Sequence, residues 1–211
     1  MTFRRSRLMP FLLLGLSLAG QRPVQFGGAL SLDVPLEGLK TDLNDKVGLG
    51  TSFQVTFGGG ERLAVRPRLD LEIFRVASYH RFHSDYREAR TFFSAGLGAD
   101  LLYAFGADAR KGLYGLAGAG VLQWFQYFEN SYRWDAYGSE SRRSHTRENR
   151  VSPWVALGLG YQITRNVGVE TRAVLSQYDG PTAGGLASFS WETPTEVRRA
   201  LIAQVAVTGR W

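Results

Sequence analysis

The sequence predicts an all-β protein made of eight antiparallel strands in up-and-down order. Three observations favour this fold: apolar residues alternate with polar or small residues at a period of two, the links between the alternating runs are long and short by turns, and aromatic residues gather at the ends of the runs. Alternation of this kind is typical of strands with two unlike faces. The chain has no Cys, which excludes a disulfide scaffold and a thiolate metal site.

Residues 1–19 are expected to be a signal peptide. Arg4, Arg5 and Arg7 precede the apolar stretch 8–18, and Ala19 ends a stretch with small residues at the positions that a signal peptidase inspects. The apolar stretch is too short to cross a bilayer, and an N-terminal helical anchor is the alternative. Removing the three Arg lowers the formal net charge from +6 to about +3, which weakens any case for nucleic-acid binding. Residues 20–211 then form the single barrel domain.

The first three runs alternate clearly. Run 24–34 has its large apolar residues at even positions, and runs 47–57 and 63–76 have them at odd positions. The second and third runs are joined by the short Gly-rich link 58–62, which is typical of a tight turn. The polar face of the third run carries Arg66, Arg68, Asp70 and Glu72.

Five further runs complete the set. They are 91–105, 113–128, 151–163, 167–178 and 198–211. The fifth run, 113–128, alternates less clearly than the others, but each of its Gly residues disfavours a helix by about 1 kcal/mol, so a strand is predicted. The strands have the length of 9–11 residues that a tilted membrane strand needs, or slightly more.

The links alternate in length along the whole chain. The four long ones are 35–46, 77–90, 129–150 and 179–197, and the three short ones are 58–62, 106–112 and 164–166. Outer-membrane barrels have long loops at the outer end and short turns at the periplasmic end, whereas a soluble sandwich has no reason to alternate so regularly. The pattern therefore predicts an eight-stranded antiparallel up-and-down transmembrane β-barrel with four long outer loops and three short periplasmic turns.

Aromatic residues near the strand ends predict two girdles at the membrane interfaces, where amphipathic rings are favoured. The rim beside the short turns would contain Phe57, Tyr103, Phe105, Tyr114, Tyr161 and Trp211. The rim toward the long loops would contain Phe93, Trp124 and Tyr178, with Trp191 a further candidate.

Two segments resemble a known family, the small outer-membrane β-barrels of the OmpA and OmpX type, also grouped as opacity-like outer-membrane barrel domains. Residues 158–170, GLGYQITRNVGVE, resemble a strand–turn–strand hairpin of these barrels, and the alternating last strand ends in the aromatic Trp211. The resemblance implies export to the outer membrane of a Gram-negative-type bacterium and a last strand, with Trp211, that the barrel assembly machinery recognises. Pro67 departs from the pattern, because a Pro inside a strand usually marks an edge or a bulge.

The polar faces are expected to meet inside the barrel as a charge network that fills the lumen. Its members would be Asp33, Arg66, Arg68, Asp70, Glu72, Asp100, Glu170, Arg172 and Arg210. An eight-stranded barrel is just wide enough for side chains to fill, and an unpaired charge there would cost several kcal/mol. A wide pore is therefore not expected.

The loops supply only weak signals of chemistry. His80 and His83 with Asp85 could ligate a metal, Ser84 and Ser144 each adjoin a His, and Asp42, Asn44 and Asp45 lack the Gly and Glu spacing of a calcium loop. The His and Ser motif of the lipid A deacylase barrels is absent. Solvated loop residues are the simpler interpretation, and no cofactor, metal or catalytic residue is expected.

Arginine dominates the basic residues, of which only Lys40, Lys46 and Lys111 are Lys. Guanidinium groups bind phosphate bidentately, so loop Arg residues could contact lipid phosphates; an Arg-rich genome is the competing explanation. The candidates are Arg81, Arg87, Arg90, Arg142, Arg143 and Arg147.

The sequence thus predicts a non-enzymatic integral outer-membrane barrel with a role in envelope integrity or surface contact. Two alternatives remain open: a barrel enzyme that acts on envelope lipids, and a soluble secreted barrel of lipocalin type with its apolar faces inward. An orientation with the apolar faces outward, toward lipid, is favoured. The polar faces hold much Gly and Ala together with stacked charges, such as Arg66 and Asp70, and would make a poorly solvated exterior.

Overall fold

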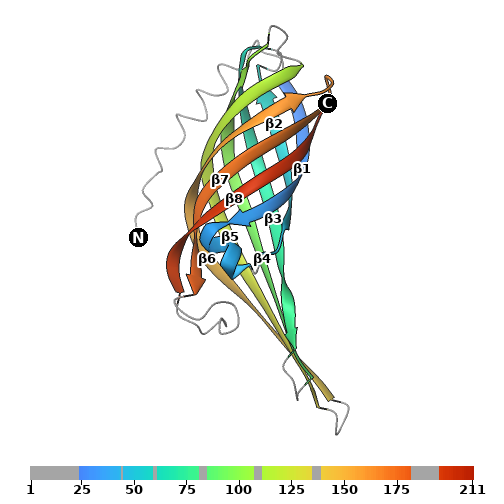
Figure 1. The fold of residues 1–211 in the computed structure, drawn as a ribbon, viewed down its shortest axis with the longest axis vertical. Coiled ribbons are helices and arrows are strands. Elements are labelled where there is room, and N and C mark those ends of the chain that lie inside the picture. The colour runs from blue at the N-terminus through green and yellow to red at the C-terminus, as the bar shows by residue number, and fades with distance from the viewer. Residues whose placement is uncertain are drawn as a thin grey trace, which may run out of the picture.

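The computed structural model describes residues 24–43, 45–58, 61–80, 85–106, 111–134, 139–181 and 195–211, with the backbone alone for 76–80, 85–90, 128–134, 139–150 and 181. Eight strands close into a barrel in the order β1-β2-β3-β4-β5-β6-β7-β8 (Figure 1). Every neighbouring pair is antiparallel, including the pair of β1 and β8 that closes the barrel. The predicted fold class is confirmed.

The strands are β1 (Val24–Leu36), β2 (Gly48–Phe57), β3 (Leu63–His80), β4 (Asp85–Ala104), β5 (Gly112–Trp134), β6 (Ser139–Gln162), β7 (Val167–Pro181) and β8 (Thr195–Arg210). The helix α2 (Glu37–Asp42) follows β1 directly. The less regular fifth run is a strand, as predicted. No helix in the described part of the chain is long and apolar enough to cross a membrane.

The two faces of the sheet have the predicted orientation. Large apolar side chains point away from the barrel axis and are exposed on its outer wall, and the most exposed of those within the strands are Leu30 at 72% and Leu157 at 70%. The charged residues between them are buried inside; Asp33 and Arg66 are both 0% exposed. This orientation contradicts the lipocalin-type alternative, which requires the apolar faces inside.

The interior is layered along the barrel axis. Phe74, Trp124 and Ile202 belong to a buried apolar cluster toward the long-loop end, which we call the mouth layer. A smaller cluster, Ala64, Leu102, Tyr114 and Leu116, lies toward the short turns. The charged side chains occupy the level between these clusters, since Arg66 to Glu72 lie on β3 between Ala64 and Phe74.

Three of the predicted long loops are wrong in detail. Link 35–46 contains α2 rather than only loop. Most of links 77–90 and 129–150 is strand, because β3 pairs with β4 as far as His80↔Arg87 and β5 pairs with β6 as far as Trp134↔Ser139. These extensions form the long projection at the lower end of the barrel in Figure 1. Their mixed-charge sequence lacks alternation, which arises only where one face is buried, so periodicity could not reveal them.

Pro67 lies within the closed barrel without producing an edge. It pairs with Ala99 of β4, while the ladder to β2 runs to Gln54↔Arg68 and resumes in the same register at Phe57↔Val65. The missing N–H of a Pro removes one ladder bond. Only the β2 side is interrupted, so neither the edge nor the bulge expected at Pro67 forms.

Candidate functional site

The charged layer of the lumen is centred on Arg66 of β3. Its Nη2 lies 2.7 Å from Asp100 Oδ2 and 2.9 Å from Glu170 Oε2, and its Nη1 also donates to Glu170. Tyr114 donates its hydroxyl to Glu170 Oε1 over 2.6 Å. One buried guanidinium therefore joins β3 to β4 and β7 across the lumen.

A second Arg extends this arrangement along β3. Arg68 donates from Nε to Asp70 over 2.8 Å and from Nη1 to Asp100 over 3.0 Å. Asp100 therefore lies between two guanidinium groups, which neutralise its buried charge. Bidentate Arg–carboxylate bonds of this kind are among the strong hydrogen bonds of proteins.

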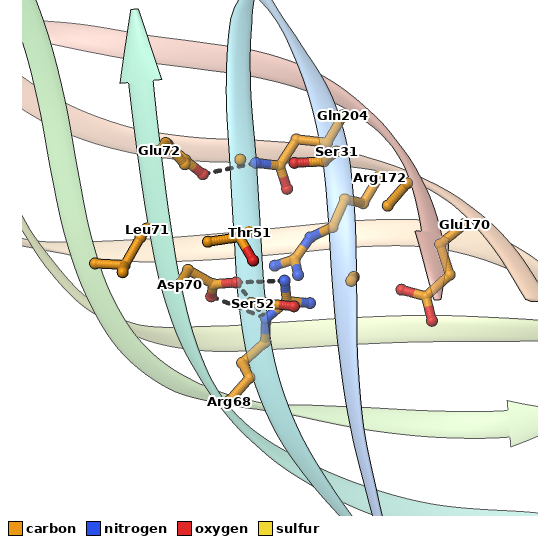
Figure 2. Close-up of a pocket in the computed structure, with 13 residues that line it drawn as sticks. Ser31, Thr51, Ser52, Arg68, Asp70, Leu71, Glu72, Glu170, Arg172 and Gln204 are labelled. Atoms are coloured by element: carbon orange, nitrogen blue, oxygen red, sulfur yellow. Dashed lines mark hydrogen bonds and ion pairs between the residues drawn. The ribbon is translucent and has the colours of Figure 1, made fainter. Parts of the chain in front are cut away.

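Two acidic residues of the layer are bound by neutral donors. Glu72 accepts from Ser94 Oγ over 2.9 Å and from Gln204 Nε2 over 2.6 Å, the latter drawn in Figure 2. Asp33 accepts from Ser31 Oγ over 2.8 Å. The structure thus places all the predicted acidic members inside, but it brings only Asp70, Asp100 and Glu170 into contact with Arg.

The two remaining basic members each lie over an aromatic ring. Arg172 lies 5.2 Å from the ring centroid of Trp154, and its Nη1 is 3.8 Å from Asp100 Oδ2. Arg210 lies 5.7 Å from the ring centroid of Tyr114 at the short-turn end. Figure 2 shows the Arg172 guanidinium beside the Arg68–Asp70 pair, with which it lines one cavity.

The lumen has almost no free volume at this level. Two small cavities share Asp70, Glu72, Arg172 and Gln204 in their lining, and each has a volume of about 10 Å³. One water molecule needs about this much space. The described side chains therefore fill the charged layer, and they leave no wide path through it.

Six of the predicted girdle residues face outward. Tyr103 and Phe105 meet edge to face with centroids 5.5 Å apart at the short-turn rim. Phe93 stacks on Phe125 at 4.6 Å toward the other rim. The other outward residues of the prediction are Phe57, Tyr161 and Trp211.

The girdle positions of Tyr114, Trp124 and Tyr178 are wrong, because all three side chains point into the lumen and are at most 6% exposed. Their positions near strand ends suggested a place in a girdle at the membrane interface. Alternate residues of a strand point to opposite faces, however, so the odd or even position of a residue decides whether its side chain faces lipid or the lumen. Tyr114 and Trp124 share a face with Leu116, and Tyr178 shares one with Val174. Strict counting of alternate positions along each strand would have revealed that these side chains point inward. The further girdle candidate, Trp191, lies outside the described residues.

The mouth layer contains α2, which the sequence did not predict. Leu39 and Leu43 are fully buried in it, and the helix packs against β1 and β8. Asp42 accepts a hydrogen bond from Tyr178 and lies 3.2 Å from Arg198 Nη1. Burial raises the pKa of Asp42 above its ordinary value, against the lowering effect of Tyr178 and Arg198. Asp42 is therefore already bound by donors of the protein, and Asn44, its neighbour in the calcium-loop candidate, lies outside the described residues.

Beyond the closed barrel, β6 extends past the end of its ladder with β7. Its ladder with β7 ends at Val155↔Leu175, although its ladder with β5 continues from Val121↔Pro153 to Trp134↔Ser139. Pro153 stands opposite Gln177 in this register, and the Gln177 carbonyl instead accepts Ser152 Oγ over 2.7 Å. Within the described residues, the β6 backbone from Ser139 to Val151 is therefore a free edge, since Pro153 has no N–H with which to continue the ladder.

The chemical candidates of the loops remain predictions. His83 and Ser84 lie outside the described residues, and only the backbone is described for His80, Asp85, Ser144 and His145. No group of three acidic or His side chains in the described part of the chain could hold a metal ion. Residues 1–19 and Arg81 also lie outside the described residues, and the other loop Arg candidates are described by their backbone alone.

The closed ladder, the apolar outer wall and the filled charged layer define a transmembrane β-barrel. No family model and no curated protein matches the chain. Among solved structures, the fold is similar to Ail, the attachment invasion locus protein of Yersinia pestis, at 10% identity and a TM-score of 0.47, over 89% of this chain and 97% of that chain.

Two further structures show a similar level of likeness. Neisserial surface protein A matches at 13% identity and a TM-score of 0.44, over 89% of this chain and 97% of that chain. The N-terminal β-barrel domain of Pseudomonas aeruginosa OprF matches at 17% identity and a TM-score of 0.41, over 90% of this chain and 100% of that domain. The architecture of the present chain is established by its own strand pairing.

Proposed function

We propose that the protein is a non-enzymatic integral barrel of the bacterial outer membrane that keeps its lumen closed and binds a surface partner along the free edge of β6. The free edge is the observation that carries the binding role. The rival hypothesis, an enzyme acting on envelope lipids, has no observation in its favour among the described residues.

Membrane insertion is supported by the outer wall. Leu49, Leu69, Leu101 and Val205 are examples of apolar side chains exposed around the barrel, and in water such a continuous belt would be unfavourable. Long connections and strand extensions occur at one end only, which matches the outer end of such barrels. We expect the protein to sediment with outer membranes, to resist carbonate extraction and to migrate differently in electrophoresis before and after boiling. Recovery of native protein from the soluble periplasm would refute this.

Within the described part of the chain, the β6 edge offers backbone groups without a strand partner beyond the apolar belt. Such an edge binds an extended segment as an added strand. Residues 139–150 contain Arg142, Arg143, Arg147 and Arg150 but only two acidic residues, Glu140 and Glu148. The partner we propose is therefore an extended acidic polypeptide segment.

The ladder register permits a sharp test of this edge. Because Pro153 has no N–H, Val121↔Pro153 must be a pair without mutual hydrogen bonds. The register of β5 and β6 then shifts by one residue between Gln123 and Phe125. Beyond that shift, the N–H groups of even-numbered β6 residues, including Thr146, point to the free edge. Thr146→Pro removes an edge donor while preserving the β5 ladder, and Thr146→Val retains the donor as a matched control.

The assay is hydrogen exchange of β6 amides in lipid nanodiscs with and without an acidic, strand-forming peptide. We expect the peptide to slow exchange in the native chain and in Thr146→Val, and to lose this effect in Thr146→Pro. Equal protection in all three proteins, or protection by a basic peptide as well, would refute edge binding.

Lipid phosphates are a second proposed contact. Arg75 and Arg199 point outward near the long-loop end, where a phosphate group of the outer leaflet would lie. The loop candidates Arg87, Arg90, Arg142, Arg143 and Arg147 belong to strand extensions at the same end. In nanodiscs of mixed lipids, less phosphorylated lipid A should associate with the double variant Arg75→Gln with Arg199→Gln than with the native protein. Equal association would contradict this contact.

A further inference from the structure

The barrel mouth holds a site that a segment of the chain itself occupies. Leu39 and Leu43 of the α2 region are fully buried among Phe74, Trp124 and Ile202. The rings of Phe74 and Tyr178 lie 6.1 Å and 6.2 Å from that of Trp124. These residues belong to one buried cluster, and we call the part of it that lies around Leu39 and Leu43, namely Phe74, Trp124, Tyr178, Ala200 and Ile202, the mouth pocket.

A carboxylate cradle adjoins the mouth pocket. The Tyr178 hydroxyl donates to the Asp42 carboxylate, and Arg198 Nη1 lies 3.2 Å from Asp42 Oδ1. Gly180 provides the room, because a Cβ added there would lie 2.9 Å from Asp42 Oδ2 and 2.5 Å from Arg198 Cδ. A hydroxyl donor, a guanidinium and a Gly therefore surround one carboxylate.

The occupant is held by docking and not by its own stability. A helix of six residues does not persist alone in water. Glu37 and Asp45, on either side of the buried residues, have φ angles of 50° and 59°, which are unfavourable for residues other than Gly. Release of α2 from the mouth pocket would relieve both conformations.

An unsatisfied donor indicates that the pocket can accept more than α2 provides. Trp124 Nε1 is fully buried and has no hydrogen-bond partner in the described part of the chain. Buried polar groups normally have a partner. Leu39 and Leu43 offer Trp124 Nε1 no acceptor, so α2 leaves this donor unsatisfied.

We propose that the mouth is a binding site for a single-chain amphiphile with an ionised carboxylate head, and that α2 is a built-in occupant which such a ligand displaces. The apolar chain would replace Leu39 and Leu43 in the mouth pocket, and the head would replace the Asp42 carboxylate between Tyr178 and Arg198. This inference goes beyond the proposed surface role and does not depend on the β6 edge.

The first experiment follows α2 directly. The chain has no Cys, so Lys40→Cys, at a solvent-exposed position of α2, accepts a single spin label in nanodiscs. At alkaline pH, where its carboxylate is ionised, dodecanoate should mobilise the label in a saturable manner. Dodecanol has no carboxylate, so it should need an about tenfold higher concentration for the same effect, as expected for the loss of a charged hydrogen bond. Equal effects of the two compounds would overturn the proposal, since both would then act only by entering the bilayer.

The second experiment measures binding of isotope-labelled dodecanoate, with empty nanodiscs subtracted. Arg198→Gln should weaken binding about tenfold. Arg165→Gln, in the exposed turn between β6 and β7 at the other end of the barrel, should leave it unchanged. The double variant Leu39→Ala with Asp42→Ala removes the competing groups and should bind more tightly. Unchanged binding in Arg198→Gln, weaker binding in the double variant, or no binding above the empty nanodiscs would overturn the proposal.

Discussion

Single residues of this barrel show how a lumen can contain many charges and still be stable. Arg66 is fully buried and contacts two carboxylates from different strands. Glu72 and Asp33 instead depend on hydroxyl and amide donors. A buried charge is tolerated only where such partners surround it, so each member of the layer constrains its neighbours.

Removal of the Arg66 charge should be strongly destabilising. Arg66→Met leaves Glu170 with the Tyr114 hydroxyl as its remaining described partner, and we expect a loss of about 3–5 kcal/mol in unfolding free energy. This loss is measured by urea unfolding in lipid vesicles, with Trp fluorescence as the signal. Arg165→Met, in the exposed turn between β6 and β7, should change stability by less than about 0.5 kcal/mol; equal losses in both variants would contradict the network.

Depth in the bilayer should determine the cost of an outward charge. Leu71 and Leu63 lie on the same face of β3 and are equally exposed, at 48%, but Leu63 is beside a short turn. Leu71→Arg should cost roughly 2–4 kcal/mol and Leu63→Arg about 0–1 kcal/mol. Folding stability in liposomes tests the order; the reverse order would show that the apolar wall does not contact lipid.

At the scale of elements, two Pro residues have opposite consequences. Pro67 interrupts a ladder that resumes in register, whereas Pro153 marks the point where β6 leaves β7. The difference arises because β2 and β3 are joined by a short turn just beyond Pro67, while no such turn lies beyond Pro153 on the β7 side. A local chain connection therefore decides whether a lost donor is tolerated or opens an edge.

Restoration of the missing donor should lengthen the β6–β7 ladder. In Pro153→Ala the new N–H can reach the Gln177 carbonyl, which in the native chain accepts Ser152 Oγ. We expect slower amide exchange at Val151, whose backbone N–H would then be able to pair with β7, and weaker binding of an acidic peptide to the β6 edge. Pro153 is exposed on the outer wall, so core packing should be unaffected; unchanged exchange would show that Pro153 does not cause the separation.

The elements also show what periodicity can and cannot predict. The alternation of β1, β2 and β7 indicated both the strands and their buried faces, because one face meets lipid and the other meets the lumen. Helix α2 gave no such signal: six residues are too few for a helical period, and its burial depends on Phe74, Tyr178 and Ile202, which are distant in sequence. The pairing of Asp42 with Arg198 likewise depends on residues that are distant in sequence.

At the scale of the whole molecule, the filled lumen predicts a barrel that conducts poorly. Planar-bilayer recordings of the native protein should show at most small and rare events, because eight strands leave little internal space and the cavities found there are about 10 Å³. Arg66→Ala with Arg68→Ala should raise conductance by removing the groups that join Asp70, Asp100 and Glu170. Large, steady channels in the native protein would refute the closed lumen.

Assembly is a second property of the whole barrel. The side chain of Trp211 is exposed. Its backbone N–H donates to the Phe26 carbonyl over 2.9 Å, next to the seam where β1 meets β8. If the barrel assembly machinery recognises this last strand, Trp211→Asp should reduce membrane insertion severalfold in cells, while Trp211→Phe should retain it. Heat-modifiable protein in membrane fractions measures insertion; normal insertion of Trp211→Asp would contradict the role of this residue.

The sequence by itself determined which face of each alternating run is apolar and which is polar, because a strand between lipid and a packed lumen must alternate. It thereby determined the eight strands and placed Asp33, Arg66, Asp100 and Glu170 inside. Only the tertiary structure decided which of these charges pair, that α2 packs into the mouth layer, and that β6, within the described residues, extends beyond its ladder with β7. These features depend on contacts between strands far apart in the chain, such as Arg66 with Glu170 and Asp42 with Arg198, and no local pattern encodes such distances.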